Sequence, residues 1–359
     1  MTKAIPRARQ FSSSRLLQSL RPVQDLPSWD LRLFVDRAYG PALPARLPWE
    51  SSNVPAACVK WFIHDGSASG GLKDGPAESS QLRATFWSDH ESTMVPLELT
   101  STSSRDNRSH DLSDSSSAFV RTYAPLKILL AHLGDQNVAS ISHSPGGQPQ
   151  EQGHSIYLAQ CELSSLPAEM QSDLPIPHLI KRSDKIKGDI YSSSLWLGRP
   201  PTYTPLHRDP NPNLFIQLAG QKIIRLYPPE VGNAIFQDIQ QRLSVRRDCS
   251  TGSTGSTTTT TTTASASSVQ HLRPPSSPSI RGEEMMQGPE RDLFHRAIWG
   301  GDSGADPDPD TARYASIAQQ YGQEAQLHLG QALFIPKGWW HSVKGVGLGV
   351  NASANWWFR

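Results

Sequence analysis

The sequence is poor in cysteine, in long apolar runs and in net charge, and each shortage excludes a class of protein. Its three cysteines, Cys58, Cys161 and Cys249, lie far apart without a C-x-x-C pair, so neither a disulfide framework nor a thiolate zinc site is expected. The 34 basic and 33 acidic residues nearly cancel, which gives no reason to expect nucleic-acid binding. No stretch approaches the roughly 18 apolar residues of a membrane-spanning helix, so no membrane contact is expected.

Acidic residues are also absent from the start of the chain, where none precedes Asp25. The segment from residue 1 to 26 is basic, and its apolar residues could form one stripe of a helix opposite the arginines. Met1–Val23 therefore has the composition of a mitochondrial transit peptide, which would place the protein in the matrix. An ordinary basic tail fits equally well and would leave the protein in the cytoplasm or nucleus.

The remaining residues, 27–359, are predicted to form a single domain that is interrupted by a polar insertion at about 246–310. This insertion contains seven consecutive threonines, one Ser-Pro step and two Asp-Pro steps. Such a composition buries too little apolar surface to offset the entropy of ordering, so we expect the insertion to be largely disordered. Asp292–Trp299 is the exception, because it could form a short docking helix.

Short apolar runs bounded by glycine and proline predict a mainly β fold with helical N-terminal elements. The expected strands are Ala57–Ile63, Ser155–Ala159, Ser192–Leu197, Asn213–Leu218, Lys222–Tyr227, Ala325–Leu329, Ala332–Ile335 and Gly347–Trp357. Apolar residues at helical spacing predict a helix over Phe119–Leu133, ended by Gly134. The many short strands predict a double-stranded β-helix, the barrel of jelly-roll or cupin type.

Three side chains form a candidate metal site: His207 and Asp209, separated by one residue, and the distant His341. In an extended segment, residues two apart project from the same face, so His207 and Asp209 can grip one ion. Two imidazoles and one carboxylate are the ligand set of non-haem Fe(II) sites, in which the remaining positions stay open. The tripeptide alone is a weak signal. The flanking sequences, Thr204-Pro-Leu before His207 and Ile335-Pro-Lys-Gly-Trp-Trp before His341, strengthen it.

These motifs resemble the JmjC (cupin-like) Fe(II)/2-oxoglutarate-dependent oxygenases, and most closely the small protein-hydroxylase branch of the hypoxia-inducible-factor asparaginyl hydroxylase type. The specific similarity runs from about Gly153 to Phe358. It implies that His207, Asp209 and His341 hold Fe(II), with 2-oxoglutarate as cosubstrate. The insertion before His341 is longer than such hydroxylases usually carry, and the region that should bind the primary substrate is not recognisable.

The resemblance also implies which residues contact 2-oxoglutarate. Lys222 would pair with the carboxylate far from the iron, and Thr204 and Tyr157 would donate hydroxyl hydrogen bonds at the same end. Three further residues would lie near the iron-bound end or form its aromatic wall: Asn213, Asn355 and Trp357.

The implied activity is hydroxylation of a protein side chain with O2, with release of succinate and CO2. The substrate would be a protein or peptide of unknown identity, and the sequence leaves homodimerisation open. Demethylation of N-methyl-lysine, as in histones, is an alternative, although no zinc-binding cysteine cluster accompanies the barrel. A catalytically silent binding module and a metal cupin that does not use 2-oxoglutarate are further alternatives, and Lys222 and Thr204 argue against the latter.

Overall fold

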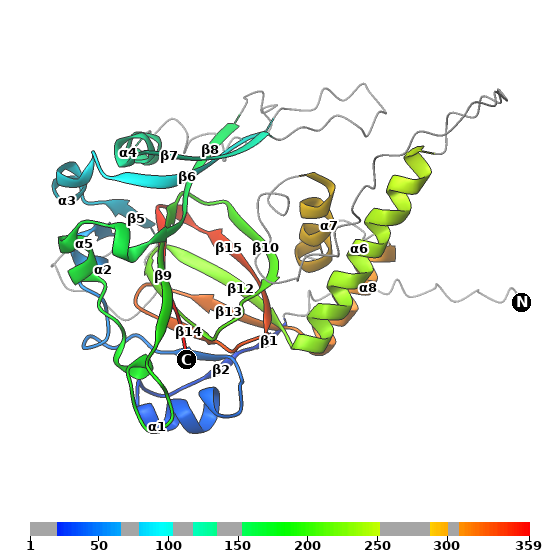
Figure 1. Ribbon diagram of the computed structural model, residues 1–359, viewed down its shortest axis with the longest axis horizontal. Coiled ribbons are helices and arrows are strands. Elements are labelled where there is room, and N and C mark those ends of the chain that lie inside the picture. Colours follow the sequence, from blue (N-terminus) through cyan, green and yellow to red (C-terminus); the bar gives the residue numbers. More distant parts are fainter. Residues whose placement is uncertain (1–19, 66–78, 103–117, 135–152, 252–287, 301–308) are drawn as a thin grey trace, which may run out of the picture.

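The computed structural model describes residues 20–65, 79–102, 118–134, 153–251, 288–300 and 309–359. Two sheets of five and nine strands form a barrel, and a three-stranded sheet lies beside it (Figure 1). The five-stranded sheet contains, in spatial order, β1 (Arg21–Pro22), β13 (Gln323–Leu327), β12 (Gln221–Tyr227), β15 (Trp340–Val346) and β10 (Thr202–Arg208).

The nine-stranded sheet contains β2 (Gln24–Asp25), β3 (Ala45–Leu47), β14 (Ala332–Ile335), β11 (Asn213–Ala219), β17 (Asn351–Phe358), β9 (Ile190–Gly198), β8 (Gly153–Glu162), β6 (Met94–Thr102) and β7 (Ala118–Pro125). The three-stranded sheet contains β16 (Leu348–Gly349), β5 (Ser79–Leu82) and β4 (Phe62–His64). The helices are α1 (Leu31–Phe34), α2 (Ala57–Lys60), α3 (Ala84–Trp87), α4 (Leu126–Gly134), α5 (Ala168–Asp173), α6 (Pro229–Thr251), α7 (Gly288–Trp299) and α8 (Pro309–Tyr321).

From β9 onward the chain passes back and forth between the two large sheets, which is the jelly-roll arrangement that the sequence predicted. The turn between β11 and β12 shows how this passage is made. Gly220 has a φ of +67°, and a Cβ there would lie 2.6 Å from the carbonyl oxygen of Val350. Only glycine tolerates both conditions. The strands on either side of Gly220 belong to opposite sheets and do not pair with each other.

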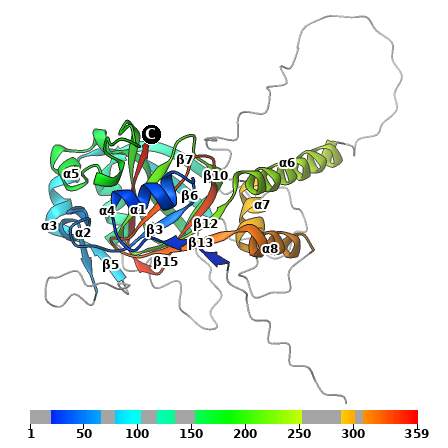
Figure 2. The same cartoon turned by 90° about the horizontal axis from the view of Figure 1, so that it is seen from below.

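The alternation of side chains along the strands divides the buried residues into three groups. One group lies between the two sheets and includes Phe215, Ile224 and Leu333. A larger group covers the outer face of the nine-stranded sheet under α2, α4 and α5. The third packs α6, α7 and α8 against the outer face of the five-stranded sheet. These three helices lie together at one side of the barrel, away from α2, α3 and α5 (Figures 1 and 2).

Two of the predicted elements are wrong in part. The expected strand Ala57–Ile63 begins as helix α2 and continues as strand β4. The expected helix Phe119–Leu133 is a strand, β7, up to Pro125, and only then becomes helix α4. Ordered backbone also begins before Pro27, because β1 pairs with β13 and β2 pairs with β3.

The expected polar insertion lies partly outside the described residues, which omit 252–287 and 301–308. Within its expected bounds, α6 extends to Thr251, and α7 includes the proposed docking helix Asp292–Trp299. The greater part of the segment that was expected to be disordered therefore lies outside the described residues. None of the helices in the described ranges combines the length and apolarity that a bilayer crossing requires.

Candidate metal centre

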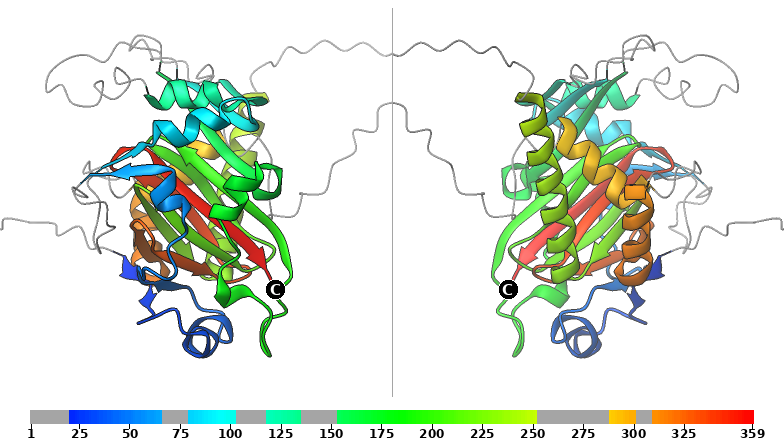
Figure 3. Two further views of the ribbon diagram at one scale, coloured as in Figure 1. Left: turned by 90° about the vertical axis from the view of Figure 1, so that its left-hand side faces the viewer. Right: turned by 90° about the vertical axis from the view of Figure 1, so that its right-hand side faces the viewer.

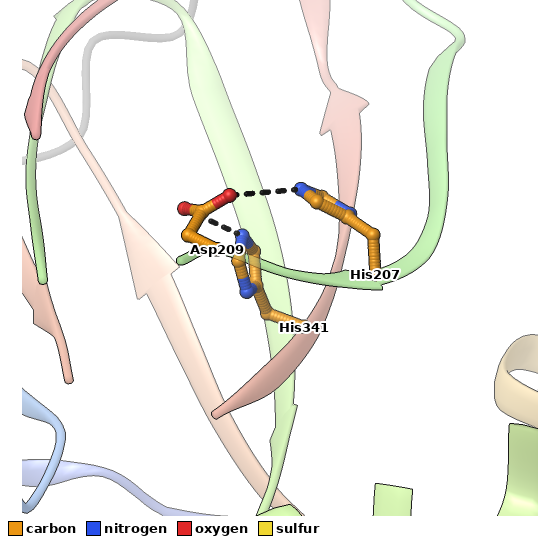
Figure 4. Close-up of side chains that lie close together, drawn as sticks. All are labelled: His207, Asp209 and His341. Carbon is orange, nitrogen blue, oxygen red and sulfur yellow. Dashed lines mark ion pairs between the residues drawn. The ribbon is translucent and has the colours of Figure 1, made fainter. Parts of the chain in front are cut away.

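His207, Asp209 and His341 meet at the inner face of the five-stranded sheet (Figure 4). His207 on β10 and His341 on β15 are direct partners across the antiparallel pair, and Asp209 follows immediately after β10. Nε2 of His207 lies 3.9 Å from Oδ1 of Asp209, and Nε2 of His341 lies 3.7 Å from Oδ2. All three candidate ligand atoms lie within 4.8 Å of one another. One ion could therefore contact the three side chains together.

A β-bulge directs the first histidine into the barrel. The register of the β10–β15 pair shifts between Thr204 and His207, so the chain between them carries an irregularity. Bulges bend a strand and re-aim its side chains, and they are common beside functional sites. Here the bulge places both Thr204 and His207 on the cavity wall, although they are three residues apart.

Backbone carbonyl groups orient both imidazoles. Nδ1 of His207 lies 2.8 Å from the carbonyl oxygen of Pro205, and Nδ1 of His341 lies 3.2 Å from that of Trp339. An Nδ1–H that donates to a carbonyl leaves Nε2 as the lone-pair atom, which is the tautomer that binds a metal. Burial, with the nearby His207, lowers the pKa of His341 to about 4. The buried imidazole is thereby kept neutral, as a metal ligand must be.

The carboxylate of Asp209 is held by two donors from the opposite sheet. Asn213 Nδ2 donates to Oδ2 over 3.1 Å, and Trp357 Nε1 donates to the same oxygen over 2.8 Å. Asn355 Nδ2 in turn donates to Asn213 Oδ1 over 3.2 Å. Asp209 is only 7% exposed, so these bonds fix its orientation rather than compete with water. Asn213 and Trp357 therefore hold Asp209 directly, and Asn355 acts on it through Asn213.

The nine residues singled out from the sequence all line one cavity between the sheets. They are Tyr157, Thr204, His207, Asp209, Asn213, Lys222, His341, Asn355 and Trp357. Sequence reasoning missed Trp196, Phe215 and Val343, which complete the lining. Phe215 and Val343 each stand two residues beyond a predicted site residue on the same strand, so the alternation of a strand was the available signal.

Lys222 points into this cavity from β12 with an incomplete set of partners. It is 2% exposed, its Nζ donates to Ser353 Oγ over 2.6 Å, and the ammonium lies 5.2 Å from the centre of the Phe215 ring. In the described part of the chain no carboxylate pairs with it, and burial alone shifts its pKa. Burial lowers the pKa of Lys222 to about 7. Buried ammonium groups are costly unless an anion is present, so the site suits an anionic ligand.

Tyr157 lines the cavity from β8. A Cβ at residue 198 would lie 2.3 Å from the Tyr157 ring, so Gly198 on β9 lets the ring lie flat against the strand. Burial raises the pKa of Tyr157 strongly, and the charge of Glu98 adds to the effect. The phenol is therefore a neutral hydrogen-bond donor at all physiological pH values.

The residues present fit a 2-His-1-carboxylate metal with an anionic ligand beside it. The donor set is correct for Fe(II), the tautomers are set, and the carboxylate is oriented by two hydrogen bonds. Lys222 supplies an uncompensated positive charge in the same cavity. Asn355 Oδ1 is buried and has no hydrogen-bond partner among the described residues, which leaves a polar atom for a bound group to satisfy.

Comparison with known families agrees with this arrangement. A family model described as a cupin-like domain matches residues 69–359, and the chain belongs to this family. The protein is 33% identical over 95 residues to JmjC domain-containing protein D of Dictyostelium discoideum, covering 24% of this chain and 21% of that protein. It is 25% identical over 202 residues to Lysine-specific demethylase 8 of Xenopus tropicalis, covering 56% of this chain and 32% of that protein.

A third relative, Lysine-specific demethylase JMJ30 of Arabidopsis thaliana, is 40% identical over 72 residues, which cover 20% of this chain and 16% of that protein. The matches span a third or less of each of these relatives. They confirm the resemblance to JmjC proteins that the motifs indicated.

Proposed function

We propose that this protein is an Fe(II)- and 2-oxoglutarate-dependent oxygenase that hydroxylates a protein side chain with O2 and releases succinate and CO2. The observation that carries the proposal is the presence of two complementary sites in one cavity. A His-Asp-His cluster offers three ligands to a metal, and a buried lysine that pairs with no carboxylate among the described residues offers a positive charge to an anion. A dicarboxylate that also binds the metal would satisfy both.

The roles of the chain's own residues follow from their contacts. His207, Asp209 and His341 would hold Fe(II), which, when bound, supplies the redox chemistry that couples 2-oxoglutarate and O2 to substrate oxidation. Lys222 would pair with the distal carboxylate of 2-oxoglutarate. Thr204 and Tyr157 line the same cavity and would donate to that carboxylate. Their hydroxyl groups select a ligand that carries acceptors at this end.

Asn213, Asn355 and Trp357 would act at the other end of the cosubstrate. Two of them already hold Asp209, and Trp357 with Trp196 forms aromatic parts of the cavity wall. An apolar wall excludes water, which strengthens every electrostatic contact inside the site.

The second candidate function is removal of a methyl group from N-methyl-lysine. Two of the relatives named above are lysine-specific demethylases by name. The same C–H hydroxylation step leads to either outcome, because a hydroxylated N-methyl group is lost as formaldehyde. Product analysis separates the two: hydroxylation leaves a peptide heavier by one oxygen atom, whereas demethylation releases formaldehyde and a lighter peptide.

The direct test is succinate formation by the purified protein with Fe(II), 2-oxoglutarate, O2 and a broad peptide panel. We expect turnover that depends on the metal and is lost in Asp209→Ala. The matched control is Asp189→Ala, which removes an exposed carboxylate paired with Arg359. Absence of any succinate, with or without peptide, would refute the proposal. It would favour a silent binding module, or a metal cupin that does not bind 2-oxoglutarate in calorimetry.

The substrate and the cellular compartment are proposals that need their own measurements. Mass spectrometry of proteins trapped by the wild type and by Asp209→Ala would identify protein partners of the site. Localisation of a tagged protein with and without Met1–Val23 would test the proposed mitochondrial targeting. Deletion of this segment removes Arg21–Pro22 of β1 as well, so a shorter deletion that ends before Leu20 is the proper control.

A further inference from the structure

Strand β10, which carries His207, lies at the edge of its sheet. Among the described strands its neighbour in that sheet is β15 alone, and their register shifts between Thr204 and His207. An edge strand interrupted by a bulge has fewer ladder hydrogen bonds to fix it than a central strand has. Its inner face opens into the cavity. Further contacts that hold the backbone of β10 come from the outer face of the sheet, where α6, α7 and α8 pack (Figure 3).

The last residue of α7 reaches both metal-bearing strands through one hydroxyl group. Trp299 Nε1 donates to Ser342 Oγ over 2.9 Å, and Ser342 Oγ donates to the carbonyl oxygen of Thr204 over 2.8 Å. Ser342 follows His341 on β15, and Thr204 is where the bulge on β10 begins. Trp299 and Ser342 are 3% and 0% exposed, so water does not compete for these bonds.

Two cations hold the Trp299 ring in place. The guanidinium of Arg225 lies 4.3 Å from the ring centre, and the ammonium of Lys344 lies 4.4 Å from it. Both side chains come from the outer face of the sheet, on β12 and β15. Arg225 Nη1 also donates to the carbonyl oxygen of Ile298 over 2.6 Å. Cation–π contacts gain strength when they are shielded from water, so the end of α7 is firmly attached to the sheet.

Helix α6 makes a second attachment close to the metal ligands. Asn233 Oδ1 accepts from Trp340 Nε1 over 3.2 Å and from Arg208 Nη1 over 3.4 Å. Trp340 immediately precedes His341, and Arg208 lies between His207 and Asp209 in the chain. A Cβ on Gly232 would lie 2.1 Å from Trp340 Cγ, so only glycine allows the helix to approach this closely.

We propose that Trp299 and Asn233 are positioning residues for the metal site, and that the helices flanking the polar segment brace the two histidine-bearing strands. The inference rests on the proposed function, because it concerns the same metal. It assigns α6 and α7 a role in supporting the metal site, which their place at the ends of the insertion would not by itself indicate. Loss of either attachment would let β10 move relative to β15, and so separate the imidazoles of His207 and His341.

Binding of Co(II), a redox-stable substitute for Fe(II), tests this directly by calorimetry and by the visible absorption of the bound ion, which reports its coordination geometry. We expect Trp299→Phe, which keeps a ring but loses the N–H donor, to bind Co(II) about tenfold more weakly and with an altered spectrum. Asn233→Ala should do the same. Asn233→Asp retains the oxygen acceptor and should restore wild-type affinity.

The matched control is Trp87→Phe, which removes a buried indole hydrogen bond of 2.7 Å to the carbonyl oxygen of Trp61. Both residues belong to the buried group on the outer face of the nine-stranded sheet, away from α6, α7 and α8. We expect it to lower the free energy of unfolding without changing Co(II) affinity. Ser342→Ala combined with Trp299→Phe should weaken binding no more than Ser342→Ala alone, because both changes break one path.

Three results would overturn the inference. One is wild-type Co(II) affinity and spectrum in folded Trp299→Phe and Asn233→Ala, with folding checked by near-ultraviolet circular dichroism. Another is an equal loss of affinity in Trp87→Phe, which would indicate a general stability effect. The third is strict additivity of Trp299→Phe and Ser342→Ala. Failure of the wild type to bind Co(II) at all would instead refute the proposed function, and the inference with it.

Discussion

Replacement of Lys222 by methionine should change two measurements in opposite directions. Methionine has a similar length and no charge, so it keeps the packing against Phe215 and removes the buried ammonium. Without a ligand, that ammonium is a cost to the fold, because burial lowers its pKa from 10.5 to about 7. With 2-oxoglutarate bound, the same charge is the expected anchor. The variant should therefore be more stable as the free protein and much poorer at binding 2-oxoglutarate.

The shift of the Lys222 pKa sets the size of the expected gain in stability. The difference between 10.5 and about 7 corresponds to roughly 5 kcal/mol for the charged form, at ~1.4 kcal/mol per pKa unit. Relaxation and water entry reduce this cost, and Ser353 loses its hydrogen bond, worth about 1 kcal/mol. We expect a net gain of about 1–2 kcal/mol in the free energy of unfolding of the metal-loaded protein at pH 6.

The pH dependence has a definite sign. Below pH 7 Lys222 is charged in both the folded and the unfolded chain, so the full cost is present. Between pH 7 and 10.5 the folded lysine loses its proton while the unfolded one keeps it, so the unfolded chain binds more protons and wild-type stability rises with pH. The advantage of Lys222→Met should thus shrink across this range. Urea unfolding at several pH values measures it, with the exposed-lysine variant Lys187→Met as control.

The loss of 2-oxoglutarate affinity in Lys222→Met should be larger than the gain in stability. Removal of one partner of a buried ion pair costs about 3–5 kcal/mol, so the Kd for 2-oxoglutarate should rise at least about a hundredfold. For the wild type, affinity should fall about tenfold per pH unit above pH 7, because the free lysine must first take up a proton. Calorimetry with Mn(II)-loaded protein tests both points. A variant that is less stable than the wild type at pH 6, or that binds 2-oxoglutarate normally, would refute this account of Lys222.

Three further predictions concern single side chains. Asp209→Ala should weaken Co(II) binding at least about a hundredfold, because it removes a ligand; calorimetry with unchanged affinity would exclude the site. Trp357→Phe removes the 2.8 Å donor to Asp209 Oδ2 and should weaken Co(II) about tenfold, and an unaltered Kd would mean that Asp209 is oriented without it. Gly220→Ala should cost about 2 kcal/mol in urea unfolding, because φ is positive and Val350 O is close; a loss under 0.5 kcal/mol would contradict this.

The structure brings the residues of the candidate site together, whereas two of the predicted secondary-structure elements are wrong in part; the metal- and ligand-binding roles of the site residues stay predictions. His207 and Asp209 are two residues apart at the end of β10, and the glycine and proline turns around His341 indicate its direction. Such signals are local. The partners that orient the ligands are not local, since Trp357 reaches Asp209 and Ser353 reaches Lys222 only after the two sheets face each other. Register between strands that are distant in sequence determines those contacts, and no short pattern encodes it.

The incorrect helix over Phe119–Leu133 has a specific cause. Apolar residues recur at helical spacing there, but Val120 and Tyr123 are 53% and 71% exposed on strand β7, which lies at the edge of its sheet. Pro125 disfavours a helical conformation at the residue before it, and Val120 and Thr122 favour a strand. Those signals were present in the sequence, and the 3.6-residue periodicity of α4 beyond Pro125 obscured them.

The long separation between Asp209 and His341 also has a physical explanation. Each doubling of a flexible loop costs only about 0.6 kcal/mol in closure entropy, so a polar segment between the two halves of the site is inexpensive. β12 and β13, on either side of that segment, pair with each other, and β12 also pairs with β15. The sheet itself therefore brings His341 back to His207. Docking of α6 and α7 on the outer face then turns the ends of the insertion into support for the strands that carry the ligands.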